Sequence, residues 1–229
     1  MTFNLFPLFS ASLLLLAGCD IDTVNPSDHY YNFNQGNQQW QAGFSDYPND
    51  NADIYQLDSG IRDLPTGFSG KGFYLAGMNR SDDLFMFIKR KITGLQPSSR
   101  YQLSASVRFL SNAGTNCFGV GGAPGESVYL KFGYAEQEPI QADYYLNVDK
   151  GNQSQDGSHS RVIGNVAAEE AGCDGEKFAG KTVTGAGETP LQFTSNADGT
   201  IWVFIGTDSG FEGLTRLYYQ ELELRITPR

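Results

Sequence analysis

The clearest pattern in the chain is an alternation of apolar and polar side chains between Tyr101 and Phe109. Every second residue there is apolar, and this period of two is typical of a β-strand with one buried face. An apolar run, residues 84–88, precedes it and leads into a turn at residues 93–99. Residues 83–110 therefore predict a long β-hairpin.

Similar short segments recur along the rest of the chain, separated by clusters of Gly, Asn, Asp and Pro that are typical of turns. The predicted strands are residues 30–34, 39–44, 53–57, 72–77, 127–133, 144–148, 190–194, 200–207 and 214–227. No convincing amphipathic helix alternates with them, so the pattern favours an all-β fold, an antiparallel β-sandwich of jelly-roll type with about ten strands. The Gly-rich, polar region 149–187 is expected to be irregular.

The N-terminus begins with an apolar stretch, residues 5–17, that is too short to span a bilayer comfortably. It ends in Leu16-Ala17-Gly18-Cys19, which resembles the lipobox of bacterial lipoproteins, although residues 1–10 contain no Lys or Arg. The resemblance implies cleavage before Cys19 and lipid on Cys19. The alternative is an ordinary signal peptide with an incidental cysteine.

This N-terminus sets the expected organisation and location of the protein. Residues 1–18 form the signal peptide, residues 19–27 the lipidated cysteine and a tether, and residues 28–229 a single β-sandwich domain. The protein is then a membrane-anchored lipoprotein of the cell envelope, facing the periplasm or the exterior. Asp20 resembles the signal that retains lipoproteins at the inner membrane of enteric-type Gram-negative bacteria.

Charge and cysteine content restrict the partners and the redox state. The formal net charge is −10, from 16 Lys and Arg against 26 Asp and Glu, so nucleic acid is not an expected partner. Besides Cys19, only Cys117 and Cys173 are present, and in an exported chain they should form a disulfide. A zinc site lacks support because the chain has only two His, neither at metal-ligand spacing from a cysteine.

Three parts of the chain carry a family resemblance. They are Asn32-Phe33-Asn34-Gln35-Gly36 followed by Trp40, the predicted hairpin over residues 83–110, and the closing part, with Asp198-Gly199-Thr200 and Tyr218-Tyr219-Gln220-Glu221-Leu222-Glu223-Leu224. Together they resemble the galactose-binding-like jelly rolls that include many carbohydrate-binding modules. The family's early acidic residue, often a structural calcium ligand, corresponds here to Asn34.

A glycan site needs flat aromatic rings that stack on sugar C–H faces, flanked by polar side chains. The candidate ligand-binding residues are Trp40, Tyr47, Tyr144, Tyr145 and Trp202. Trp202 alternates with apolar residues, so it points outward if they point into the core. The alternative is that Trp40 and Trp202 only cover the ends of the core.

The stretch from residue 46 to residue 58 is rich in oxygen ligands of the kind that calcium prefers. The candidate metal residues are Asp46, Asp50, Asp53 and Asp58. Asp82-Asp83, Asp208 and Glu212 are further ligands that other loops could contribute. The alternative is a solvated acidic loop.

Taken together, these features predict a lipid-anchored cell-envelope protein that binds a glycan and is not an enzyme. A hydrolase needs two placed carboxylates or a nucleophile with its base, and no local motif supplies either. The alternatives are a structural envelope protein that makes protein–protein contacts and, third, a glycan-acting hydrolase or lyase. Calcium is the one candidate cofactor.

Overall fold

The computed structural model describes residue 1, residues 27–186 and residues 189–229. The expected signal peptide, the lipidated Cys19 and the tether lie outside the described residues. Within the described part of the chain, no helix is long and apolar enough to cross a membrane.

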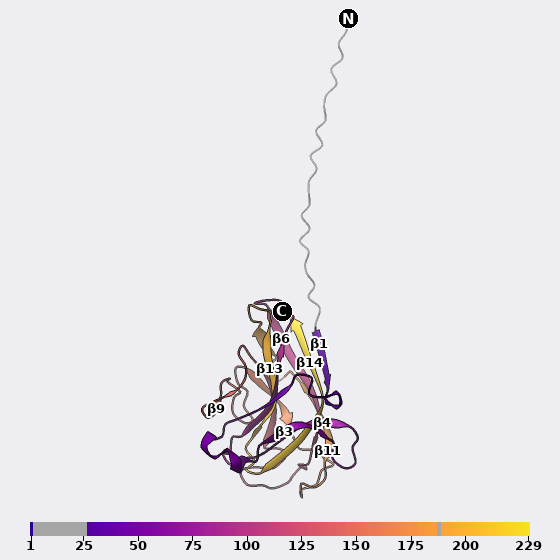
Figure 1. Cartoon of the computed structure of the whole chain (residues 1–229), viewed down its shortest axis with the longest axis vertical. Coiled ribbons are helices and arrows are strands. Elements are labelled where there is room, and N and C mark those ends of the chain that lie inside the picture. The colour runs from indigo at the N-terminus through magenta and orange to yellow at the C-terminus, as the bar shows by residue number, and fades with distance from the viewer. Residues whose placement is uncertain (2–26, 187–188) are drawn as a thin grey trace.

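The described chain is an antiparallel β-sandwich, which confirms the predicted all-β, jelly-roll fold (Figure 1). One sheet has seven strands: β11 (Ala179–Gly185), β6 (Arg100–Ser111), β14 (Leu214–Pro228), β4 (Lys71–Met78) and β3 (Asp58–Asp63), with β1 (Ser27–Asn32) beside β14 and β12 (Leu191–Thr194) beside β6. The second has five strands, in the order β10 (Ser160–Asn165), β7 (Val128–Ala135), β13 (Ile201–Ser209), β5 (Phe85–Ile92) and β2 (Gln41–Ser45). A small hairpin, β8 (Gln141–Ala142) and β9 (Tyr145–Leu146), and two 3-10 helices, η1 (Phe33–Gln35) and η2 (Asn49–Tyr55), complete the described elements.

The core lies between the two sheets and is built from the alternating apolar residues of facing strands. Ile201, Val203 and Ile205 of β13 are fully buried there, while Trp202 between them is half-buried on the opposite face. The predicted outward orientation of Trp202 is therefore confirmed.

The predicted hairpin over residues 83–110 is wrong. β5 pairs with β2 and β13 in the five-stranded sheet, whereas β6 pairs with β14, β11 and β12 in the seven-stranded sheet. Two successive strands with one apolar face each can share a core by facing each other across it as well as by pairing edge to edge. The connection between them therefore crosses from one sheet to the other.

Two further expectations fail locally. Residues 53–55 of the predicted strand 53–57 belong to η2, and the region 149–187, expected to be irregular, contains β10 and β11. Both of these strands lie at sheet edges, each paired with a single neighbour. Edge strands bury less side-chain area, so their apolar pattern is weak.

The predicted disulfide is confirmed. Cys117 and Cys173 are bonded, with their Cα atoms 5.4 Å apart. The bond joins the loop after β6 to the connection between β10 and β11. It therefore tethers part of the 149–187 region to the body of the sandwich.

Candidate functional site

The outer face of the five-stranded sheet carries an unusual mixture of aromatic and ionised side chains. The alternation that turns Ile205 of β13 inward turns Phe204 and Asp208 outward, and in β7 it turns Lys131 outward. The segment containing β8 and β9 covers this face, and its Leu146 packs against Phe204 in a second, smaller hydrophobic cluster. The outward charges are consequently buried.

Lys131 and Asp208 form a fully buried ion pair on this face. Asp208 Oδ2 accepts hydrogen bonds from Lys131 Nζ at 2.9 Å, from Lys150 Nζ at 3.0 Å and from the Gln153 backbone N–H at 2.9 Å. Lys131 Nζ also donates to the carbonyl oxygens of Lys150 and Gln155, at 2.9 and 3.0 Å. These bonds attach the loop after β9 to the sheet.

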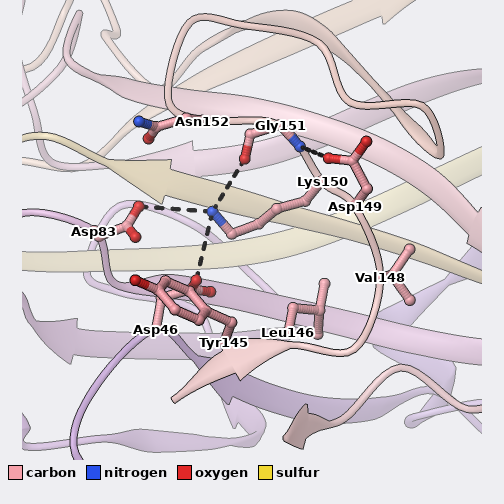
Figure 2. A pocket seen from close by; sticks show the side chains of 9 residues that line it. All are labelled: Asp46, Asp83, Tyr145, Leu146, Val148, Asp149, Lys150, Gly151 and Asn152. Carbon is pink, nitrogen blue, oxygen red and sulfur yellow. Dashed lines mark hydrogen bonds and ion pairs between the residues drawn. The ribbon is translucent and has the colours of Figure 1, made fainter.

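Two more carboxylates approach Lys150 from other loops (Figure 2). Asp46 follows β2 and Asp83 precedes β5, and these strands are neighbours in the sheet. Lys150 Nζ lies 3.9 Å from Asp46 Oδ1 and 3.6 Å from Asp83 Oδ1, distances of ion pairs that are too long for hydrogen bonds. Asp46 Oδ2 accepts a hydrogen bond of 2.7 Å from the Ser45 hydroxyl.

Burial and charge act in opposite directions on these groups. Burial raises the pKa of Asp46 to about 6, although Lys150 and Ser45 oppose the shift. Burial likewise raises the pKa of Asp83. Burial alone would lower the pKa of Lys150, but the carboxylates of Asp208, Asp46 and Asp83 outweigh it and raise that pKa. Lys150 is therefore charged at neutral pH.

Some of the carboxylates that the sequence suggested as metal ligands do come together, but they surround the ammonium group of a lysine. Asp46, Asp83 and Asp208 surround Lys150, whereas Asp50 and Asp53 are exposed on η2. Asp58 pairs with Arg62 on β3. Among the described residues, no group of three or more His, Cys, Asp or Glu side chains could hold a metal ion.

Beside Lys150 lies a pocket of about 350 Å³, which we call the Tyr145 pocket (Figure 2). Its lining residues are Asp46, Asp83, Tyr145, Leu146, Val148, Asp149, Lys150, Gly151 and Asn152. Tyr145 is 63% exposed. The pocket therefore combines an accessible aromatic ring with several polar groups.

The loop that forms one wall of the Tyr145 pocket is fixed by Asp149. Its carboxylate accepts hydrogen bonds from the Gly151 backbone N–H at 3.0 Å, the Ser158 backbone N–H at 2.8 Å and the Ser158 hydroxyl at 2.7 Å. These bonds to Ser158 and Gly151 lower the pKa of Asp149 to about 2. The wall is held in place before any ligand arrives.

The other predicted ligand-binding aromatics are distributed differently. Trp40 is fully buried against Tyr31, so its ring is not available to a ligand and its predicted role is wrong. Tyr47 is half-buried against Tyr55 and does not line the pocket.

Two predicted aromatics lie near Tyr145 or share its face of the sheet. Tyr144 packs edge-on against Tyr145, with ring centroids 4.8 Å apart. Trp202 lies on the outer face of the five-stranded sheet, paired across strands with Lys91 and Ala135, and does not line the pocket. Of the predicted aromatics, Tyr145 alone lines it.

The two buried lysines could not be recognised from the sequence. Lys131 occupies an outward position of a predicted strand, and Lys150 lies in a polar segment typical of a turn. Neither feature signals burial. For the carboxylates a signal was present: Asp46 was a candidate metal ligand, and Asp83 and Asp208 were candidate ligands from distant loops.

No protein-family model and no curated protein matches this chain. Among solved structures it is similar to the mannan-recognising carbohydrate-binding module TmCBM27 (TM-score 0.41, 10% identity, covering 90% of this chain and 99% of that one). It is also similar to the CBM22-1 xylan-binding domain of Paenibacillus barcinonensis Xyn10C (0.40, 10%, 88% and 94%) and to the K3 adhesin domain of Lys-gingipain from Porphyromonas gingivalis W83 (0.42, 8%, 88% and 99%). These likenesses are too distant to carry an argument about what this chain binds.

Proposed function

We propose that this protein binds a glycan in the Tyr145 pocket without transforming it. The observation that carries the proposal is the exposed ring of Tyr145 beside carboxylates whose hydrogen-bonding capacity is unused. Asp46 Oδ1 and both oxygens of Asp83 accept no hydrogen bond from the described residues.

The chemistry of this arrangement suits a sugar ring. The C–H face of a pyranose can stack on an aromatic ring, and its hydroxyl groups can donate to carboxylates and accept from Asn152. Pre-formed walls reduce the conformational entropy lost on binding. The hydrogen bonds of Asp149 supply such a wall.

A glycan array probed with the full-length chain in detergent tests the proposal, followed by calorimetry on the glycans that bind. Tyr145→Ala should weaken binding by about tenfold, because an aromatic stacking contact contributes roughly 0.5–1.5 kcal/mol beyond the apolar area that it buries. Tyr145→Phe keeps the ring and should bind almost as well as the wild type.

Tyr30→Ala is the matched control, because Tyr30 is 60% exposed but lies on β1 in the other sheet. It should not change affinity. No binding on the array, or binding that is unaffected by Tyr145→Ala, would contradict the proposal.

We also propose that the protein acts at the cell envelope through a lipid on Cys19, supported by the segment Leu16-Ala17-Gly18-Cys19 at the end of an apolar run. Mass spectrometry of membrane-extracted protein should find Cys19 as the lipid-modified amino terminus. An unmodified Cys19, or cleavage elsewhere, would refute the anchor without affecting the glycan proposal.

A further inference from the structure

The charge balance of the Tyr145 pocket restricts the kind of glycan that fits. Four carboxylates lie in or directly beneath the pocket, and only two ammonium groups oppose them. The carboxylates are those of Asp46, Asp83, Asp149 and Asp208, and the ammonium groups those of Lys131 and Lys150. A ligand therefore enters a site with an excess of negative charge.

The two ammonium groups already have hydrogen-bond partners within the protein. Lys131 Nζ donates to Asp208 and to two carbonyl oxygens, and it is fully buried. Lys150 Nζ donates to Asp208 at 3.0 Å and to the Gly151 carbonyl oxygen at 3.5 Å. Neither lysine therefore satisfies the hydrogen-bonding capacity of Asp46 and Asp83.

Asp83 is the carboxylate that a ligand can reach. Its side chain is 27% exposed. Its Oδ1 is buried and forms an ion pair with Lys150 Nζ at 3.6 Å, whereas its Oδ2 accepts no hydrogen bond from the described residues. Asp46 lines the same pocket, is almost fully buried, and has one oxygen that accepts no hydrogen bond. A carboxylate oxygen that is open to the pocket and has no donor within the protein can accept hydrogen bonds from a ligand.

We propose that the glycan of the Tyr145 pocket carries a free amine, as in an unacetylated amino sugar, whose ammonium group pairs with Asp83. This inference rests on the proposed glycan-binding function and narrows its substrate class. An ammonium group brings three donors and a positive charge, and charge-assisted hydrogen bonds are roughly twice as strong as neutral ones. An N-acetylated sugar brings one neutral N–H donor, and a uronic acid brings a repelled carboxylate.

The test compares three oligosaccharides of equal length with the full-length chain in detergent, near pH 7, where Asp46, whose pKa burial raises to about 6, is ionised. They are an oligomer of glucosamine, the same oligomer fully N-acetylated, and an oligomer of galacturonic acid. The glucosamine oligomer should bind at least about tenfold more tightly than the N-acetylated one, as expected from one added charge-assisted contact. The galacturonic acid oligomer should bind most weakly.

Two variants separate a contact in the pocket from general attraction to an acidic protein. Asp83→Asn should reduce the preference for the glucosamine oligomer to near one. Asp82→Asn removes the same charge from the adjacent residue, which is exposed and does not line the pocket, and should leave the preference intact. A melting curve of each variant establishes that it is folded.

The outcomes distinguish the two proposals. Equal affinity for the glucosamine and N-acetylated oligomers, or a preference that survives Asp83→Asn, overturns the amine inference while the glycan proposal stands on its Tyr145 dependence. A preference that both variants reduce equally also overturns the inference, since it then reflects net charge. Failure to bind any glycan on the array overturns both proposals.

Discussion

Asp208→Asn is the most informative perturbation of the buried ion cluster. The substitution keeps the shape of the side chain and one carbonyl oxygen, but removes the negative charge that Lys131 and Lys150 share at 2.9 and 3.0 Å. Asp208 and Lys131 are fully buried, and Lys150 is 6% exposed, so water cannot replace the lost charge. Lys150 retains Asp46 and Asp83 as more distant partners, whereas Lys131 has no other carboxylate within ion-pair distance among the described residues.

Removing one partner of a buried ion pair costs about 3–5 kcal/mol, because the remaining charge stays buried and unpaired. In a protein of this size, each kcal/mol lowers the melting temperature by about 2–4 °C. The variant should therefore melt about 6–20 °C below the wild type. Because the same carboxylate accepts from the Gln153 N–H, the loop at residues 150–155 should also become more susceptible to proteolysis.

Urea unfolding followed by tryptophan fluorescence, together with calorimetric melting of the full-length chain, measures the loss. Asp63→Asn is the matched control, since Asp63 pairs with Lys71 at 2.7 Å but with side chains that are 86% and 48% exposed. Exposed pairs contribute about 0–1 kcal/mol, so this control should change stability little. If Asp208→Asn lowers the free energy of unfolding by less than about 1 kcal/mol, the view that buried, ionised lysines need the negative charge of Asp208 is refuted.

Three further predictions test other parts of the structure by the same unfolding measurements. Trp40→Ala should cost about 3–5 kcal/mol of stability because its ring is fully buried, and Trp202→Ala should cost clearly less because its ring is half-buried; equal losses would contradict the packing described. Replacing Cys117 and Cys173 together by Ser should lower stability by about 2–5 kcal/mol, and an unchanged urea midpoint would count against the tether. Because the pKa of Asp149 is lowered, the ionised carboxylate stabilises the fold above pH 4, and this stabilisation is lost as the pH falls towards 2. Asp149→Asn should therefore destabilise the protein at pH 7, by about 1 kcal/mol for this exposed side chain, but not at pH 2. An equal loss of stability at both pH values would contradict the lowered pKa.

Strands and the faces of their side chains could be predicted from sequence where the apolar alternation is strong, as in β6 and β13. The side-chain direction in a strand is a local property with a period of two, so neighbours along the chain are sufficient to determine it. The disulfide could be predicted because only two cysteines besides Cys19 were present. The pairing partners of the strands could not be predicted from sequence. The apolar pattern shows that β5 and β6 contribute to one core, but not whether they lie side by side in one sheet or face each other across the core.

In the candidate site, too, some features follow from the local sequence and others depend on the tertiary structure. The sequence by itself determined that Lys131 lies on the opposite face of its strand from Val128, Leu130 and Phe132, and it named Asp208 and Tyr145 only as candidate ligand residues. Only the tertiary structure decided that a segment more than 50 residues away from Asp208 covers that face, buries both charges and brings Lys150 to the same carboxylate. The reason is physical: the direction of a side chain depends on its own strand, but its burial and its charge partners depend on which distant segment packs over it.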